Sequence, residues 1–489
     1  MTDLTTTPLS DLDVDLLVLP VRGDGPDAWA DAFGATYRAA LDDARTTTSP
    51  AVVLRDGEGP KRLAVVVADA PEGDEGWRWA AAAAAGVADA LKLERVAIAA
   101  PDAASAAPLV EGFRLGAYRY DAYRTAEVPP AVRLAVRVEE ASAAARQLVA
   151  EADVRAEVTG RARDLVNLPP DAKMPAALAD LVEADARAAG LAVDVWDEAR
   201  IEAEGMGGIL GVNRGSLDPA RFVVIEHAPE GHADEAPVVL VGKTVTYDTG
   251  GLSLKPTKDS MDKMKADMAG GAAVVGALLG AARLGLAVRV IGLLPMSDNR
   301  PGGRAYAPGD VLTMHSGATV EVMNTDAEGR LLLADALSYA RQLGPRLVVD
   351  VATLTGAQGI ALGERVAAVV TRPGADDLAG RLRQLGEATG DLAWPLPLYD
   401  HYPKQLKSDV ADLSNVGGRM AGTITAAAFL DHFTRDDDGE PAYPWAHLDI
   451  ARPSFLDSPY GYRPKGASGF GVSLLLGLLA DEAERADGR

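Results

Sequence analysis

Two segments of the chain gather acidic and basic side chains of the types that could bind metal ions. The first runs from Lys243 through Asp248 and Lys255 to Asp267, and the second is the run from Asn324 to Arg330. Any one of these side chains, taken alone, is most simply a solvated loop residue, a helix cap or a salt-bridge partner. An inference about chemistry therefore has to come from the set as a whole.

Four carboxylates form the centre of that set: Asp248, Asp267, Asp326 and Glu328. Hard divalent cations prefer oxygen ligands, and two carboxylates separated by one residue on a loop can point into one site. Four clustered negative charges would repel one another without cations between them. Two divalent ions about 3.5–4 Å apart would neutralise them. The spacing by itself supports a metal site without identifying a reaction.

Other kinds of catalytic site find little support in the sequence. The chain has no cysteine, which excludes disulfides, thiolate metal sites and a cysteine nucleophile. No nucleophile elbow of a serine hydrolase surrounds Ser253 or Ser260. The histidines do not show the spacing of a zinc protease helix and are expected to be structural or exposed. They are His227, His232, His315, His401, His432 and His447.

Short apolar runs rich in β-branched residues surround the acidic segments. Residues 238–241, 288–294 and 347–351 are nearly unbroken apolar runs, and helical patterns over 268–284 and 331–343 alternate with them. This alternation predicts an α/β fold with a mixed, largely parallel sheet covered by helices. Ligands of such sheets lie beyond the carboxyl ends of the strands, where the acidic segments are found.

The preceding part of the chain predicts a smaller α/β domain without chemistry of its own. Expected strands are 16–20, 51–54, 63–67 and 96–100, with a helix over 77–91. A long helix over 141–166 ends at two prolines, which cannot continue it. We therefore expect an N-terminal domain over 1–150, serving oligomer contacts or access control, a linker helix over 151–172, and a catalytic domain over 173–489.

Size and charge limit the classes of function. A chain of 489 residues is expected to form more than one domain. The net charge of -23 repels phosphate backbones and anionic membranes, which makes nucleic acid an unlikely partner. The first 20 residues are acidic rather than basic, unlike a signal peptide, and the longest apolar stretch is shorter than a membrane span. A cytoplasmic protein without a membrane partner is expected.

The run Asn324-Thr-Asp-Ala-Glu-Gly-Arg330-Leu strongly resembles the signature of the leucyl (cytosol) aminopeptidases, which are two-metal enzymes. The segment from Lys243 to Asp267 is similar to the family's other metal-site segment. Together with further matches, the resemblance covers about residue 160 to the end. These further matches are Asp164–Asn167, Ala352–Ala357, Gln405–Asp412, Trp445–Ala451 and Gly466–Gly471.

The resemblance implies a ligand set for two divalent ions, most simply Mn or Zn, with Mg or Co as alternatives. One ion would be held by Lys243, Asp248, Asp267 and Glu328. The other would be held by Asp248, Asp326 and Glu328, with the backbone carbonyl of Asp326. A lysine ligand must bind as the neutral amine, because an ammonium has no lone pair. A water bridging the metals would attack the scissile carbonyl.

The same resemblance implies the remaining roles and the substrate. Lys255 would stabilise the developing oxyanion, and Arg330 would hold a bicarbonate ion that shuttles the proton. An apolar pocket would favour Leu-like N-terminal residues of peptides that have a free N-terminus. A homohexamer is implied as well. The pocket residues would be Met264, Thr353, Leu354, Gly356 and Ala451.

Two alternatives remain open on the sequence. A two-metal hydrolase with another substrate, such as a phosphatase, would need cations to clamp phosphate, and Lys255 and Arg330 are the two in view. A binding protein without catalysis, for instance a DNA-binding hexamer, would need a basic stripe. The acidic balance argues against that stripe, although arginines lie within residues 114–124.

Overall fold

The computed structural model of the chain describes residues 1–23, 25–55, 58–126 and 131–486. It divides into two compact units. Unit 1 contains Met1–Gly160 together with Ser458–Lys465, and unit 2 contains Arg161–Asp457 and Gly466–Arg489. The division falls inside the long helix α4 (Ala143–Asn167), in the region where the sequence predicted a linker helix. The sequence pattern gave no sign that a segment near residue 460 would join the first unit.

Unit 1 is a six-stranded sheet with helices on both faces. Its strands are parallel except for the edge strand β3, which pairs antiparallel with β4. Helix α1 (Asp27–Thr47) packs on one face, and α2 (Asp74–Ala90) with α3 (Ala103–Gly116) covers the other. Across the sheet the strands are β1 (Asp3–Thr5), β6 (Arg133–Arg137), β5 (Arg95–Ala99), β2 (Leu16–Val21), β4 (Arg62–Val67) and β3 (Ala51–Leu54).

Unit 2 is built on a nine-stranded mixed sheet. Four neighbouring strands at its centre, β18, β14, β9 and β11, run parallel, and β10 adds a parallel partner to β11. Across the sheet the strands are β16 (Ala393–Leu396), β15 (Ala367–Thr371), β18 (Trp445–Asp449), β14 (Leu347–Ala352), β9 (Val238–Gly242), β11 (Val290–Asn299), β8 (Arg221–His227) and β7 (Ala192–Trp196), with β10 (Thr244–Asp248) beside β11.

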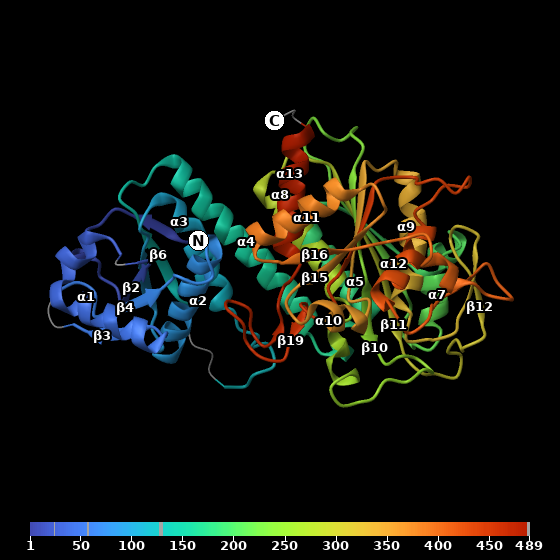
Figure 1. Ribbon diagram of the computed structural model, residues 1–489, viewed down its shortest axis with the longest axis horizontal. Coiled ribbons are helices and arrows are strands. Elements are labelled where there is room, and N and C mark those ends of the chain that lie inside the picture. Colours follow the sequence, from blue (N-terminus) through green and yellow to red (C-terminus); the bar gives the residue numbers. More distant parts are fainter. Residues whose placement is uncertain (24, 56–57, 127–130, 487–489) are drawn as a thin grey trace. The chain divides into compact units, whose positions relative to one another are not determined.

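Helices cover both faces of this sheet, as Figure 1 shows. The core on one face lies beneath α9 and α12, and that on the other beneath α8 and α13. The helices of the first face are α7 (Gly207–Asn213), α9 (Gly329–Ala340) and α12 (Gly422–His432), and those of the second are α5 (Pro175–Ala188), α8 (Ala269–Leu284), α11 (Asp376–Thr389) and α13 (Val472–Ala486).

Helix α8 lies unusually close to the central strands because its first turn is made of small residues. A Cβ on Gly270 would lie 2.0 Å from the carbonyl oxygen of Val351, and one on Gly271 would lie 2.2 Å from Thr244 Oγ1. The stretch Met261–Leu284 has the length and apolar composition of a membrane span, yet 83% of its most apolar window is buried inside the protein. It is the core helix of this unit.

The α/β architecture predicted from the sequence is confirmed, with two differences in detail. Strand β11 continues through Pro295 to Asn299, five residues beyond the apolar run that predicted it. The segment that contains Asp248 is itself a strand, β10, rather than a loop. Both strands therefore deliver polar side chains directly to the carboxyl edge of the sheet.

Candidate active site

The five residues predicted to ligate metal come together at the carboxyl edge of the unit 2 sheet. Lys243 follows β9, and Asp248 is the last residue of β10. Asp267 follows the short 3-10 helix η3 (Met261–Ala266), and Glu328 is the N-cap of α9. Carboxylate oxygens of Asp248, Asp326 and Glu328 all lie within 4.8 Å of one another, close enough to hold one metal ion. The edge lies near the labels of β10 and α10 in Figure 1.

Lys243 is buried at the inner end of the cluster, and its ammonium makes three contacts. Its Nζ lies 2.8 Å from Asp267 Oδ1 and 2.8 Å from Glu328 Oε1. It also donates to the backbone carbonyl of Thr353 at 2.9 Å. A Cβ on Gly329 would lie 2.3 Å from Lys243 Cε, so the glycine after Glu328 makes room for the lysine.

Lys255 lies at the outer side of the cluster and bridges the other two carboxylates. Its Nζ lies 2.8 Å from Asp248 Oδ2 and 2.5 Å from Asp326 Oδ1. The side chain of Lys255 is 14% exposed, against 3% for Lys243, so it borders the open side of the site. The two lysines thus separate four carboxylates into two pairs, and the cluster keeps an excess of negative charge.

Burial and mutual repulsion alter the protonation of the cluster. Burial, followed by the charge of Glu328, raises the pKa of Asp248 to about 7. Burial likewise raises the pKa of Asp267 well above its ordinary value. Burial works in the same direction on Glu328, but Lys243 and Lys255 together bring the pKa of this residue below its ordinary value. Bound cations would therefore favour the ionised form of these carboxylates.

The donor set fits divalent cations. Among the described residues, neither Asp267 Oδ2 nor Glu328 Oε2 has a hydrogen-bond partner, although both atoms are buried. An unpaired buried carboxylate oxygen is costly unless a cation or donor reaches it. Carboxylate oxygens are ligands that Mn²⁺, Mg²⁺ and Zn²⁺ accept. The residues present therefore suit metal ions at this position.

Polar residues that the sequence reasoning did not single out hold the ligands in place. Asn299, at the end of β11, donates from Nδ2 to Asp248 Oδ1 at 2.7 Å and to the carbonyl of Thr325 at 3.0 Å. The hydroxyl of Tyr306 donates to the same carbonyl at 2.7 Å. Thr325 Oγ1 accepts from Ser253 N at 2.8 Å, which fastens the Lys255 loop to the Asp326 loop. For Asn299, the sequence offers one signal, which is the change from apolar to polar residues at the end of β11.

Arg330 occupies the first turn of α9 beside the cluster and is buried. It donates from Nη1 to the carbonyl of Asn415 at 2.7 Å. Its Nε–H is buried and has no hydrogen-bond partner within the part of the chain that the structure describes. Burial lowers the pKa of Arg330 to about 10, which leaves the side chain charged at neutral pH. A buried cation with a free donor suits an anion.

The residues predicted to line the side-chain pocket lie on three segments, which are η3, the segment after β14 and the segment after β18. Met264 is on η3, and Thr353 donates from Oγ1 to Asp267 Oδ1 at 2.7 Å. The backbone N–H groups of Leu354 and Ala451 both donate to Asp449 Oδ1 at 3.2 Å, which ties the ends of β14 and β18 together.

Gly356 begins α10 (Gly356–Leu362), directly after the Thr353–Thr355 turn. Counting all described atoms, a Cβ built on Gly356 would meet nothing within 4 Å. Space therefore lies directly beside this glycine.

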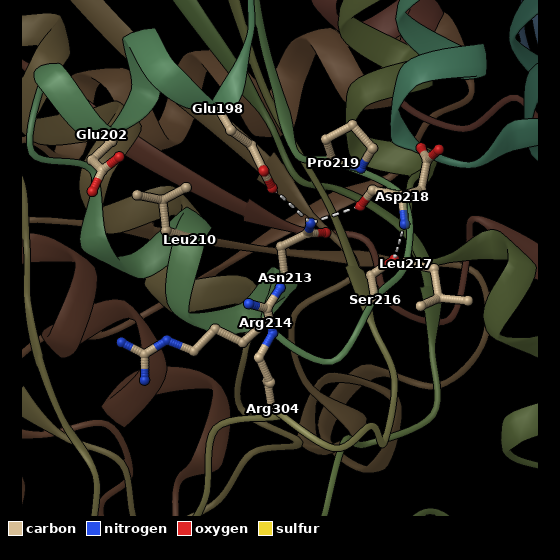
Figure 2. Close-up of a pocket in the computed structure, with 10 residues that line it drawn as sticks. All are labelled: Glu198, Glu202, Leu210, Asn213, Arg214, Ser216, Leu217, Asp218, Pro219 and Arg304. Carbon is tan, nitrogen blue, oxygen red and sulfur yellow. Dashed lines mark hydrogen bonds between the residues drawn. The ribbon is translucent and has the colours of Figure 1, made fainter.

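A separate cavity of about 480 Å³ lies elsewhere in unit 2, around the α6 (Glu198–Ala203) and α7 helices (Figure 2). Asn213 donates from Nδ2 to Glu198 Oε1 at 3.3 Å and to the carbonyl of Asp218 at 2.8 Å. These polar groups hold the loop after α7 against α6. None of the residues predicted for the active site lines this cavity, so it is distinct from the predicted site.

Comparison with known sequences identifies the family. The catalytic-domain model of the cytosol aminopeptidase family matches residues 161–476, and the model of the family's N-terminal domain matches residues 46–127. The chain belongs to the cytosol aminopeptidase family. A probable cytosol aminopeptidase of Chlorobium luteolum is 42% identical and covers 98% of this chain and 99% of its own length. One of Micrococcus luteus is 42% identical, with 98% of each chain covered.

Two solved structures show the same fold. A mutant of tomato leucine aminopeptidase superposes with a TM-score of 0.87 at 28% identity, covering 98% of this chain and 97% of that one. The bottromycin maturation enzyme BotP in complex with Mn superposes with a TM-score of 0.83 at 36% identity, covering 96% and 100%. The chain is thus a leucyl aminopeptidase-type metallo-exopeptidase, a hydrolase that acts on peptides.

Proposed function

We propose that this aminopeptidase removes single N-terminal residues, preferentially Leu-like, from peptides with a free N-terminus, using two divalent metal ions. The observation that carries the proposal is the cluster of four buried or half-buried carboxylates divided by two lysines. A phosphatase would need more cations facing the substrate, whereas here the lysines already neutralise the enzyme's own carboxylates.

The ligands divide between the two ions as follows. Lys243, Asp248, Asp267 and Glu328 would hold one ion, and Asp248, Asp326 and Glu328 would hold the other. The Mn complex of the relative BotP supports Mn²⁺, and the donor set also suits Zn²⁺, Mg²⁺ or Co²⁺. When bound, such ions would lower the pKa of a water molecule and polarise the scissile carbonyl.

Lys255 is suited to stabilise the negative charge that develops on the carbonyl oxygen. Its ammonium lies at the open side of the cluster, between Asp248 and Asp326. With divalent ions held by those two carboxylates, the Lys255 ammonium would be free to donate to a substrate oxygen. A donor positioned for the transition state lowers the barrier more than one that binds the ground state equally well.

Arg330 would hold bicarbonate rather than act as a base, because a guanidinium keeps its proton at neutral pH. Its free Nε–H and its charge are available to an anion, and its place in the first turn of α9 adds the positive end of the helix dipole. The bound anion supplies a group that can accept and return a proton, which Arg330 itself cannot do.

The pocket residues would select the N-terminal side chain. Met264, Leu354 and Ala451 would supply apolar surface, and the space beside Gly356 would admit a branched aliphatic side chain. The free α-amine would be placed at the metal site and the carbonyl beside Lys255. An internal peptide bond has no amine to offer, which explains why single terminal residues would be released.

The setting proposed for this reaction is a cytoplasmic homohexamer. The names of the relatives, cytosol aminopeptidases, support the location. We propose the hexamer on the basis of the resemblance to the family. We also propose that unit 1 serves oligomer contacts or controls access to the site.

Hydrolysis of leucine p-nitroanilide, measured beside its N-acetylated form, tests the proposal. We expect cleavage of the free-amine substrate with Mn²⁺ present, loss of cleavage after chelation, and recovery when Mn²⁺ is returned. The N-acetylated substrate should remain intact because it lacks the amine. Cleavage of both substrates, or of neither with Mn²⁺ bound, would contradict the proposed reaction.

A further inference from the structure

The side chain of Lys173 is fully buried in unit 2, with backbone oxygens around its ammonium. Its Nζ donates to the carbonyl of Leu165 at 3.2 Å, to that of Val166 at 2.7 Å and to that of Lys265 at 2.6 Å. An ammonium has three N–H donors, so each of these carbonyls receives one. Lys173 therefore joins two segments that are about 100 residues apart in the sequence.

Two of these acceptors belong to the C-terminal end of α4, where the last four carbonyls of a helix lack intrahelical partners. All four are satisfied here. Asp164 O accepts from Leu168 N at 3.1 Å, Lys173 takes the next two, and Asn167 O accepts from Lys265 Nζ at 3.1 Å. The negative end of the helix dipole favours both lysines.

This arrangement makes the amine of Lys173 difficult to replace. Burial lowers the pKa of Lys173 well below its ordinary value, and the charge of Lys265 acts in the same direction. A neutral amine, with two N–H donors, would leave one of the three carbonyls unpaired, and an apolar side chain would leave all three unpaired. The three carbonyls thus favour the ammonium that burial disfavours.

The third acceptor connects this helix end to the active site. Lys265 lies on η3 between Met264 and Asp267, the residues placed in the side-chain pocket and at the metal site. Lys173 holds the backbone of η3 through the Lys265 carbonyl. Lys263, on the same short helix, forms an ion pair with Asp457, with its Nζ 2.7 Å from the carboxylate. The position of η3 therefore depends on contacts outside the metal cluster.

We propose that Lys173 is a positioning residue for metal binding, which fixes η3 and thereby sets Asp267 toward its ion. The inference rests on the proposed function, since it assumes that Asp267 is a ligand. Asp267 Oδ1 accepts hydrogen bonds from Lys243 and Thr353, and the backbone at the end of η3 fixes the position from which this carboxylate extends. A residue that orients a metal ligand typically contributes about 10- to 100-fold to metal affinity.

The test is Mn²⁺ binding to the full-length Lys173→Met variant after chelation, followed by electron paramagnetic resonance of free Mn²⁺ and by calorimetry. We expect the Kd of at least one ion to rise by about 10-fold or more. The visible spectrum of Co²⁺ bound in place of Mn²⁺ should change as well, because it reports ligand geometry. Neither measurement depends on catalysis.

A matched control is Asp391→Ala, also in unit 2. Asp391 is buried, and its Oδ2 accepts from Gly471 N at 3.0 Å and Leu474 N at 3.3 Å at the start of α13. This variant also loses buried hydrogen bonds to backbone and should lower the melting temperature, but the Kd for Mn²⁺ should stay at the wild-type value. An equal loss of affinity in both variants would mean that Lys173 acts through general stability, and would overturn the inference.

A second variant, Lys173→Gln, decides the question if Lys173→Met does not fold. Its shorter side chain offers two N–H donors in place of three, so at least one of the three carbonyls loses its donor. A few-fold rise in the Kd for Mn²⁺ is expected. Unchanged affinity in every lysine variant that folds would refute the inference alone, whereas a wild-type protein that binds no Mn²⁺ would refute the proposed metal site itself.

Discussion

Replacement of Lys255 by methionine gives the most informative test of the site, because two measured quantities should move in opposite directions. Methionine keeps much of the aliphatic stem and removes the ammonium that lies between Asp248 and Asp326. Loss of one preorganised donor to a developing oxyanion typically costs about 100- to 1,000-fold in kcat. We expect a loss of this size with leucine p-nitroanilide at saturating Mn²⁺.

Metal affinity should rise in the same variant. In the metal-free site the Lys255 ammonium competes with cations for two carboxylates, and a hydrogen bond to a charged group contributes about 1.5–3 kcal/mol. The Asp326 side chain is 32% exposed, so solvent screens its share. We therefore take a net contribution of about 1.5 kcal/mol. Its removal corresponds to roughly tenfold tighter Mn²⁺ binding, since 1.4 kcal/mol is a factor of ten.

The assays are steady-state hydrolysis and Mn²⁺ titration of the chelated protein. Chemical rescue supplies the control: the chain has no cysteine, so Lys255→Cys can be alkylated with 2-bromoethylamine at that position alone. The resulting amine should restore much of kcat and return the Kd toward the wild-type value. Full activity in Lys255→Met, or Mn²⁺ binding weakened tenfold, would refute the assignment of Lys255 to the substrate oxygen.

Three further outcomes follow from the same geometry. Lys243→Met should weaken Mn²⁺ binding by more than tenfold in the same titration, because the loss of a ligand outweighs the loss of the ammonium that contacts Asp267 and Glu328 in the metal-free site; tighter binding would exclude Lys243 as a ligand. Gly356→Val should fill the space beside the glycine and lower kcat/KM for a leucine amide by about tenfold or more while sparing an alanine amide; equal losses on both amides would place Gly356 outside the pocket. Mn²⁺ at 100 times its Kd should stabilise the protein by about 2.7 kcal/mol, seen in calorimetry as a rise of a few degrees in Tm that a chelator reverses; an unchanged Tm would contradict binding at the buried cluster.

The fold could be predicted because its strands are short apolar runs separated by helical patterns. The buried strands β9 and β14 and the small-residue helix α8 all fall where the pattern placed them. The end of β11 could not be predicted this way, because Pro295, Asp298 and Asn299 interrupt the apolar signal. These residues are tolerated inside the sheet because other polar groups satisfy them. Asn299, for example, donates to Asp248 and to Thr325.

The candidate site was predicted in part from residue types and in larger part from the resemblance. Carboxylate spacing indicated a metal site, and the structure brings three of the four carboxylates within the reach of one ion. The roles of Lys173 and Tyr306 had no local signal, because each acts on a segment distant in the sequence. Such contacts depend on the packing of the whole unit rather than on any short motif.

The grouping of Ser458–Lys465 with the first unit has a consequence for how the chain can be cut. The ring of Tyr460 meets that of Trp79 edge to face at 4.7 Å, the hydroxyl of Tyr462 donates to Glu75 at 3.3 Å, and Arg463 pairs with Glu75 at 3.7 Å. The polypeptide therefore passes between the units three times, at residues 160, 457 and 465. After a single proteolytic cut in α4, residues 1–160 would still be bound by Ser458–Lys465, which belongs to the other fragment. The two fragments should therefore separate under denaturing conditions and co-elute in size-exclusion chromatography under native conditions.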